Sequence, residues 1–100
     1  MQLECNQTVI CGKLIKLGAL RYTPVGIAVI EFTVHHESRQ REAGAMRQII
    51  FDVFVIAMDQ LALQVAEFKV DSMVKLSGFL NRKSHMNQQL VLHASQIELI

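Results

Sequence analysis

Four histidines and two cysteines are the residues of this 100-residue chain that could act as nucleophiles, bases or metal ligands. His35 and His36 are adjacent in an alternating apolar segment, so they point to opposite faces of a strand and cannot hold one metal ion together. Cys5 and Cys11 have no second pair, which excludes both a disulfide framework and a Cys-x-x-Cys zinc site. We expect both cysteines to be small, half-buried strand residues.

The sequence contains none of the short motifs that mark common catalytic sites. It has no glycine-rich phosphate loop, no Gly-x-Ser-x-Gly nucleophile and no His-Glu-x-x-His pair. His93 lies in an apolar strand, where a single histidine is more often a hydrogen-bonded structural residue than a ligand, and His85 lies in a polar loop. We therefore expect no catalytic residue, no metal and no cofactor, and we do not expect an enzyme.

Basic side chains indicate binding instead. Of the ten lysines and arginines, eight lie in three regions around the expected hairpins, which an OB-fold brings to its open face. These eight are Lys13, Lys16 and Arg21 in the first region, Arg39, Arg41 and Arg47 in the second, and Arg82 and Lys83 in the third. Such clusters can follow a phosphate backbone, whereas the alternative is that these loops are polar only because they face water.

Stacking aromatic rings are the second feature of single-strand nucleic-acid sites. The phenylalanines all lie in apolar patterns, and we interpret them as core residues: Phe32, Phe51, Phe54, Phe68 and Phe79. Tyr22, next to Arg21, is the single aromatic residue in a basic loop, where its ring could stack on a base. We therefore expect electrostatic attraction to phosphates to dominate binding, so that the affinity falls as the salt concentration rises.

The composition predicts one packed domain over residues 1–100, because 51% of the residues are hydrophobic and 19% are charged. The net charge of +1 means that any DNA site must come from local clustering of cations. No apolar run is long enough to span a membrane, and the first residues lack the pattern of a signal peptide. We expect a cytoplasmic protein.

Alternating apolar residues predict three strands in the first half of the chain, over 9–17, 27–36 and 49–56. Thr23-Pro24-Val25-Gly26 has the composition of a four-residue turn, so the first two strands form a hairpin. Residues 37–46 are polar and carry charges of both signs, which predicts a mobile hairpin loop. The third strand is apolar on both faces and needs cover on both sides.

The hydrophobic period changes after the third strand. Leu61, Val65 and Phe68 recur at helical spacing behind Asp59, an expected N-cap, and predict a short amphipathic helix over 59–68. Two further strands follow, over 73–80 and 90–97, separated by a polar stretch at 81–89. The order predicts an all-β OB-fold, a five-stranded, partly open Greek-key barrel with one short helix between strands 3 and 4.

Segments in both halves of the chain resemble bacterial single-stranded-DNA-binding proteins and their PriB relatives. Residues 20–32 (LRYTPVGIAVIEF) are similar to the first-hairpin signature of those binding proteins, and Glu42-Ala43-Gly44 followed by Arg47-Gln48 resembles PriB chains specifically. The stretches 77–80 (SGFL) and 92–100 (LHASQIELI) are very similar to the end of PriB chains. The likeness runs from about Gln7 to the C-terminus.

The resemblance implies a homodimer of OB-folds that binds single-stranded DNA and acts with the PriA helicase and other primosome proteins in the restart of stalled replication forks. The end of the chain at Ile100, directly after its last expected strand, favours PriB over general single-strand coating proteins, which typically continue into a flexible linker and an acidic tip. The N-terminal strand agrees with a dimer, because a small open barrel cannot cover its two apolar faces alone.

Departures from the family pattern predict weak DNA binding. Ala45 and Ile50 occupy positions where relatives can carry aromatic residues, and the last hairpin keeps only Arg82, Lys83 and His85 where relatives can be richer in lysine. Weak DNA binding favours a role in which the chain acts mainly on the helicase. Two alternatives stay open: a general single-stranded-DNA coating protein of the same fold, and an OB-fold adaptor that binds proteins and touches DNA little.

Overall fold

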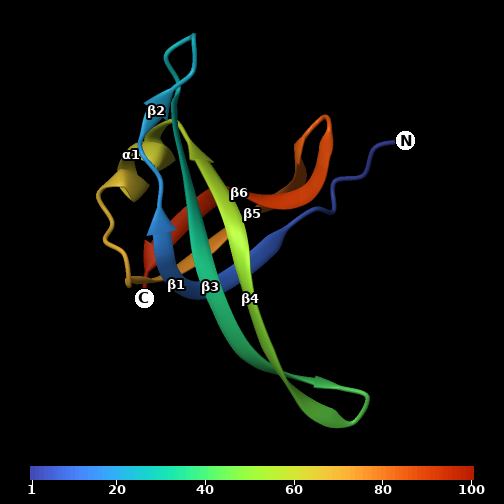
Figure 1. Ribbon diagram of the computed structural model, residues 1–100. Coiled ribbons are helices and arrows are strands. Elements are labelled where there is room, and N and C mark those ends of the chain that lie inside the picture. Colours follow the sequence, from blue (N-terminus) through green and yellow to red (C-terminus); the bar gives the residue numbers. More distant parts are fainter.

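The computed structural model describes residues 1–100 as six strands and one short helix (Figure 1). In chain order the elements are β1 (Thr8–Leu17), β2 (Arg21–Tyr22), β3 (Ala28–Glu42), β4 (Ala45–Met58), α1 (Gln60–Ala66), β5 (Met73–Ser84) and β6 (Asn87–Leu99). The helix has seven residues, and the chain contains no helix long and apolar enough to cross a membrane.

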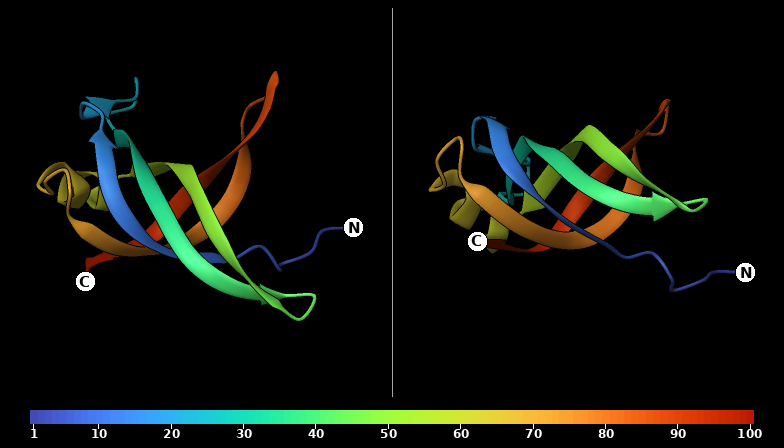
Figure 2. Two further views of the ribbon diagram at one scale, coloured as in Figure 1. Left: turned by 60° about the horizontal axis from the view of Figure 1, so that its bottom comes forward. Right: turned by 90° about the horizontal axis from the view of Figure 1, so that it is seen from below.

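Five of the strands close into a barrel because β1 pairs with two different partners. Its first half pairs with β5 and its second half with β3, both antiparallel. The remaining seam joins β4 to β6 in parallel through two residue pairs, Val55 with Leu92 and Ile56 with His93. The barrel is therefore partly open at this seam (Figure 2). The expected all-β OB-fold, with its helix between the third and fourth barrel strands, is confirmed.

The change of partner along β1 depends on a bulge and a glycine. The register with β3 shifts between Leu14 and Lys16, so Ile15 is the extra residue that lets the strand bend. Gly12 lies where β1 approaches β3 closely, and a Cβ atom there would collide with the carbonyl oxygen of His35. A residue without a side chain is therefore required at this crossing.

Alternate residues of the strands fill the barrel interior. On β3, Ala28, Ile30, Phe32 and Val34 are all buried, as the alternation of apolar residues over 27–36 predicts. The rest of the buried cluster comes from the other elements: Leu14, Val55, Ala57, Ala62, Val65, Val74, Leu76, Leu92 and Ile97. Removal of these apolar side chains from water is the main stabilising contribution to the fold.

The helix α1 covers one end of the barrel. Ala62 and Val65 are buried there, and Leu61 and Phe68 pack against the core cluster, as their spacing predicted. The expected cap is wrong, because the side chain of Asp59 forms no capping hydrogen bond and its φ is 60°. Asp59 instead contributes its backbone carbonyl, which accepts a hydrogen bond from the N–H of Ala62 at 3.1 Å.

The first hairpin contains the turn that its composition predicted. The N–H of Gly26 donates to the carbonyl oxygen of Thr23 at 2.8 Å, and the φ of 87° at Gly26 is one that glycine adopts without strain. The sequence did not reveal β2, whose residues Arg21 and Tyr22 pair with the start of β3.

The mobile loop expected over residues 37–46 is wrong. β3 and β4 stay paired as far as Glu42 and Ala45, and the turn between them consists of Ala43 and Gly44 alone. Both turn residues have positive φ, 53° and 78°, as a two-residue type I′ hairpin turn requires. This turn chemistry keeps the two polar segments in a regular ribbon.

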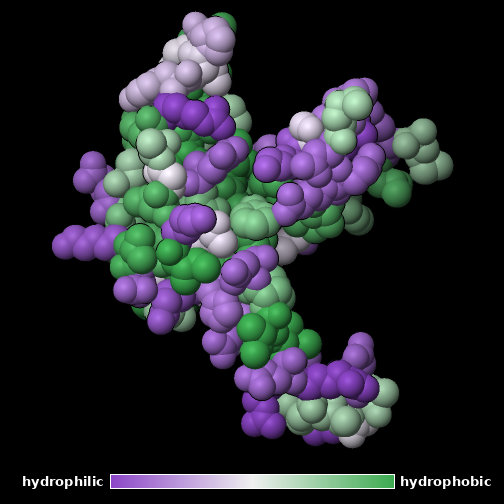
Figure 3. All heavy atoms as spheres, in the orientation of Figure 1, coloured by the Kyte–Doolittle hydropathy of each residue, from purple (hydrophilic) through white to green (hydrophobic).

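Residues 37–50 form a two-stranded ribbon that projects from the barrel, and we call it the arm (Figure 1). The polar stretch expected at 81–89 is also mostly strand, since β5 runs to Ser84 and β6 begins at Asn87. Figure 3 shows that both projecting ribbons are mostly hydrophilic, with a hydrophobic area where the arm leaves the barrel. Because both faces of these ribbons contact water, their residues do not alternate between apolar and polar. The sequence pattern therefore predicted loops here.

Candidate nucleic-acid interface

The barrel has a solvent-side surface over β1, β3, β4 and the β5–β6 ribbon that carries apolar as well as polar side chains. Residues paired across neighbouring strands share one side of a sheet. Phe54 is the register partner of Thr33, Ile56 that of Glu31, and Lys16 lies opposite Thr33 on the other flank. We call this surface the outer face; it carries Lys13, Lys16, Glu31, Thr33, His35, Phe54, Ile56, Phe79, Lys83 and His93.

A hollow of about 360 Å³ lies in the middle of the outer face. Phe54 of β4 lines it together with His93 of β6, and the ring of Phe54 is 46% exposed. Lys16 of β1 and Lys83 of β5 line the same hollow. An exposed aromatic ring between two ammonium groups can stack on a base while the cations meet the flanking phosphates.

A second aromatic pair adjoins the hollow. Phe79 of β5 stacks on His93, its register partner on β6, with ring centroids 5.0 Å apart and an interplanar angle of 10°. Phe79 is 42% exposed. Phe54, His93 and Phe79 therefore place aromatic rings on three neighbouring strands of one face.

The interpretation of all five phenylalanines as core residues is wrong for three of them. Phe32 is buried and Phe68 is half-buried, but Phe51, Phe54 and Phe79 are 39%, 46% and 42% exposed. One barrel has one interior, so a strand that is apolar on both faces leaves one set of side chains in solvent. That double-sided pattern on β4 was the signal in the sequence that could have identified Phe54.

The first basic region divides between the two sides of the sheet. Lys13 and Lys16 lie on the outer face. Arg21 reaches the same face and forms an ion pair of 3.3 Å with Glu31, which lines the hollow. Tyr22 is 60% exposed but follows Arg21 in an extended strand, so its ring points to the opposite side.

The two other basic regions also divide. Arg39 and Arg41 point outward along the arm on the side of the outer face, whereas Arg47 lies on the other side and pairs with Glu42 at 3.0 Å. Adjacent extended residues alternate, so Arg82 points away from the side on which Lys83 lines the hollow. Its guanidinium lies 3.1 Å from Nδ1 of His85. Of the nine predicted residues, Lys16 and Lys83 meet at one site, and Tyr22, Arg47 and Arg82 lie off it.

The adjacent histidines point to opposite sides, as expected. Nδ1 of His35 lies 2.7 Å from Asp52, and Nε2 lies 2.9 Å from Glu37. The hydrogen bond to Asp52 is the main cause that raises the pKa of His35 above 6.5, followed by the hydrogen bond to Glu37. His36 contacts the carbonyl oxygen of Cys11 at 2.7 Å.

The cysteines differ from the expectation of half-buried strand residues. Cys5 and Cys11 are both free and exposed. Cys5 lies before β1, and Cys11 lies in the part of β1 that pairs on one edge only, with β5. Neither cysteine lines the hollow at Phe54.

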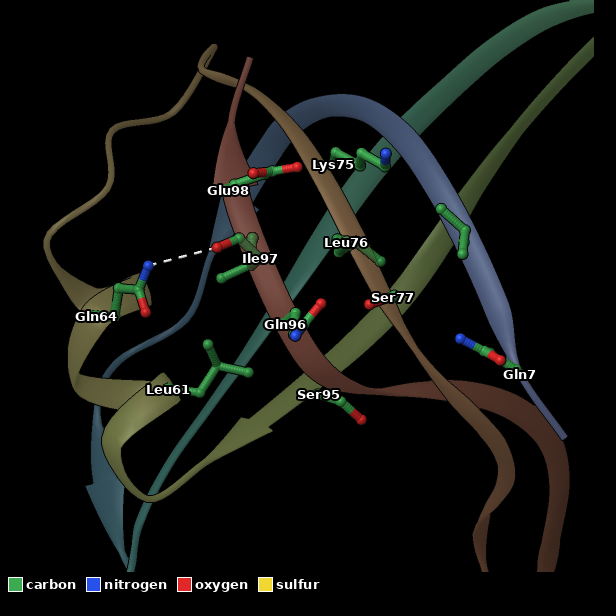
Figure 4. Close-up of a pocket in the computed structure, with 11 residues that line it drawn as sticks. Gln7, Leu61, Gln64, Lys75, Leu76, Ser77, Ser95, Gln96, Ile97 and Glu98 are labelled. Carbon is green, nitrogen blue, oxygen red and sulfur yellow. Dashed lines mark hydrogen bonds between the residues drawn. The ribbon is translucent and has the colours of Figure 1, made fainter. Parts of the chain in front are cut away.

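A larger hollow of about 600 Å³ lies beside α1, and Figure 4 shows the side chains around it. Gln64 of α1 reaches across to donate a hydrogen bond of 3.4 Å to the carbonyl oxygen of Ile97. Lys75 and Glu98 are register partners on this wall, so the positive charge of the lysine is offset by the negative charge of the glutamate. With no aromatic ring and no net positive charge, this hollow suits a nucleic-acid strand less well than the outer face.

The fold and the outer face together define an OB-fold protein of the single-strand binding class. Residues 6–96 match the model of a family described as "Another single-strand binding protein family". The chain belongs to this family and, within it, to the replication restart protein PriB family.

Individual relatives cover nearly the whole chain. The chain is 37% identical to replication restart protein PriB of Nitrosomonas europaea, over 95% of this chain and 88% of that protein. It is 40% identical to the PriB of Photorhabdus laumondii, over 98% and 96%. The solved structure of PriB from Ralstonia solanacearum superposes with a TM-score of 0.85 at 26% identity, covering 94% of this chain and 96% of that one. These are families of non-catalytic binding proteins, which confirms that the chain is not an enzyme.

Proposed function

We propose that the chain binds single-stranded DNA on its outer face as a non-catalytic accessory of replication restart. The observation that carries the proposal is the convergence of Lys16, Lys83 and the exposed ring of Phe54 at one hollow. Stacking of a base on an aromatic side chain contributes roughly 1 to 3 kcal/mol, and it does not depend on sequence.

The geometry favours a single strand over a duplex. A stacking ring needs an unpaired base, and the bases of a duplex already stack on their neighbours. The rings of Phe54, His93 and Phe79 lie on the surface of a curved sheet, where a flexible strand can follow them from β4 to β5.

The binding is weak because few unopposed cations reach the strand. Arg21 is paired with Glu31, and the net charge of the chain is +1. Ile50, on the same side of β4 as Phe54, is exposed but offers no ring. Each phosphate contacted adds about 0.7 to the salt slope on single strands, so two or three contacts give a shallow dependence.

The proposed partners are the PriA helicase and other primosome proteins, together with a second copy of this chain. The relatives carry the name replication restart protein, which supports a partner that acts in replication restart. The arm can also take part in a protein contact, because its mixed charges suit specific recognition. A homodimer is supported by the first half of β1, which pairs on one edge only and exposes 53% of Val9.

The test of DNA binding is a fluorescence anisotropy titration with labelled oligothymidylate and with a duplex of equal length, at low and at moderate salt. We expect binding to the single strand that weakens with salt, and much weaker binding to the duplex. Equal affinity for both would contradict the stacking site. Absence of binding at low salt would leave the protein-binding adaptor as the better interpretation.

A further inference from the structure

A cluster of charged residues crosses the outer face between the hollow and the arm. Lys13 of β1, His35 of β3 and Asp52 of β4 are register partners in a row across the three strands. Glu37 follows on β3, two residues beyond His35, on the same side. The charged groups that face the imidazole are therefore Asp52, Glu37 and Lys13.

The contacts of His35 favour its protonated form. Nδ1 lies 2.7 Å from Oδ1 of Asp52, and Nε2 lies 2.9 Å from Oε2 of Glu37. A carboxylate only accepts hydrogen bonds, so both ring nitrogens must carry protons for both contacts to form. The arrangement is therefore one that an imidazolium, with a proton on each ring nitrogen, satisfies fully between the two carboxylates.

These carboxylates lie between two groups of cations. Lys16 borders the hollow on one side, and Arg39 and Arg41 point outward along the arm on the other. Asp52 and Glu37 are 48% and 58% exposed, so both can repel the phosphates of a strand that passes from the hollow to the arm. The charge of His35 decides how strongly these two carboxylates repel the phosphates.

We propose that His35, Asp52 and Glu37 form a proton-dependent barrier across the DNA-binding face. When His35 is protonated, it offsets one of the two negative charges, and a strand can extend from the hollow to the arginines of the arm. When His35 is neutral, the carboxylates repel the phosphates, and the strand is confined to the hollow. This inference rests on the proposed DNA binding, and it adds that binding takes up a proton.

The pKa of His35 supports the same direction. The hydrogen bonds to Asp52 and Glu37 raise it above 6.5, and a phosphate nearby would raise it further. The loss of one positive charge beside exposed phosphates is screened by salt, so the expected change in affinity is modest, about two- to fivefold.

The experiment measures the dissociation constant of labelled oligothymidylate by anisotropy, at constant ionic strength, from about pH 6 to about pH 9. We expect the wild type to lose about two- to fivefold in affinity as the pH rises. His35→Gln should bind at the weaker level throughout, and the double variant Glu37→Gln, Asp52→Gln should bind tightly throughout. His36→Gln is the matched control, because this ring lies on the other side of the sheet, and it should keep the wild-type profile.

The outcomes separate this inference from the proposed function. Curves for His35→Gln and the double variant that run parallel to the wild type overturn the barrier, while DNA binding itself stands. Absence of binding by every variant at low salt overturns the proposed function, and the barrier with it. Circular dichroism of each variant verifies that the fold is intact.

Discussion

Lys16 on β1 and Lys83 on β5 line the same hollow, although they come from the first and the last hairpin of the chain. The barrel brings them together because β1 pairs with β3 and β5, and β6 pairs with β4. Both lysines therefore share this hollow with Phe54, so their ammonium groups can meet the phosphates that flank a stacked base.

Replacement of Lys83 by alanine should weaken the binding of single-stranded DNA, whereas replacement of Arg82 should change it little. Lys83 lines the hollow, and Arg82 points to the opposite side, so the two variants remove the same charge at adjacent positions. Anisotropy titrations at several salt concentrations should show a slope lower by about 0.7 for Lys83→Ala. A larger loss for Arg82→Ala would move the site to the other side of the ribbon.

Phe54→Ala should reduce the affinity for single strands by roughly 1 to 3 kcal/mol, the contribution of one stacked base. The ring is 46% exposed, so a thermal melt should show only a small loss of stability. Phe51→Ala is the matched control, since Phe51 is similarly exposed but packs against His36 on the other side of β4. An equal loss of affinity in both variants would refute the assignment of the stacking residue.

The stability of the fold should fall as the pH rises through the pKa of His35. The hydrogen bond to Asp52 and then that to Glu37 raise this pKa in the folded state above 6.5. The stabilising contribution is therefore fully present below 6.5, the unfolded value, and is lost as the pH rises through the folded pKa. Urea denaturation at several pH values should show this decline in the wild type and a flatter profile in His35→Gln. Identical slopes in the two proteins would exclude His35 as the cause.

We expect a dimer of twice 11.3 kDa in sedimentation at tens of micromolar protein. Val9→Asp should shift the equilibrium toward the monomer, because this side chain is 53% exposed beside the unpaired edge of β1. Gln60→Asp, at an exposed neutral residue that begins α1, serves as a control that adds the same single negative charge away from β1. A wild-type protein that stays monomeric at this concentration would remove the dimer from the proposed function.

The role of a helicase partner can be separated from simple strand capture. Unwinding by PriA should be stimulated by the wild-type chain and should largely survive the Lys83→Ala substitution, because a direct protein contact raises the local concentration of the strand site. If stimulation falls in proportion to the lost DNA affinity, strand capture alone explains it. Arg82→Ala should stimulate like the wild type in either case.

The sequence predicted the core correctly on strands that have one face toward the barrel interior and the other toward water. Ala28, Ile30, Phe32 and Val34 alternate strictly, and all four are buried. The arm could not be identified in this way, because its strands have water on both faces and no apolar period. The tight turn at Ala43 and Gly44, which sets its register, leaves a weak signal when the first residue is alanine.

The candidate DNA-binding site could be predicted only in part, and the reason is similar. Clustering of cations along the chain identified Lys16 and Lys83, but it could not tell them from Arg47 and Arg82. Which side of a strand a charge occupies depends on register, and a shift of one residue exchanges the two sides. Phe54 was missed because an apolar pattern does not distinguish a core residue from one on an uncovered face.

The short pairing between β4 and β6 means that a bound single strand would stabilise the closed form of the barrel. Two residue pairs join these strands, and one of them is Ile56 with His93. A base seated between Phe54 and His93, as proposed, would contact both strands at the seam that is joined by the fewest residue pairs in the barrel. A ligand that binds only the folded state stabilises that state by mass action. We therefore expect the barrel to open between β4 and β6 more readily in the free chain than in the chain with a bound strand.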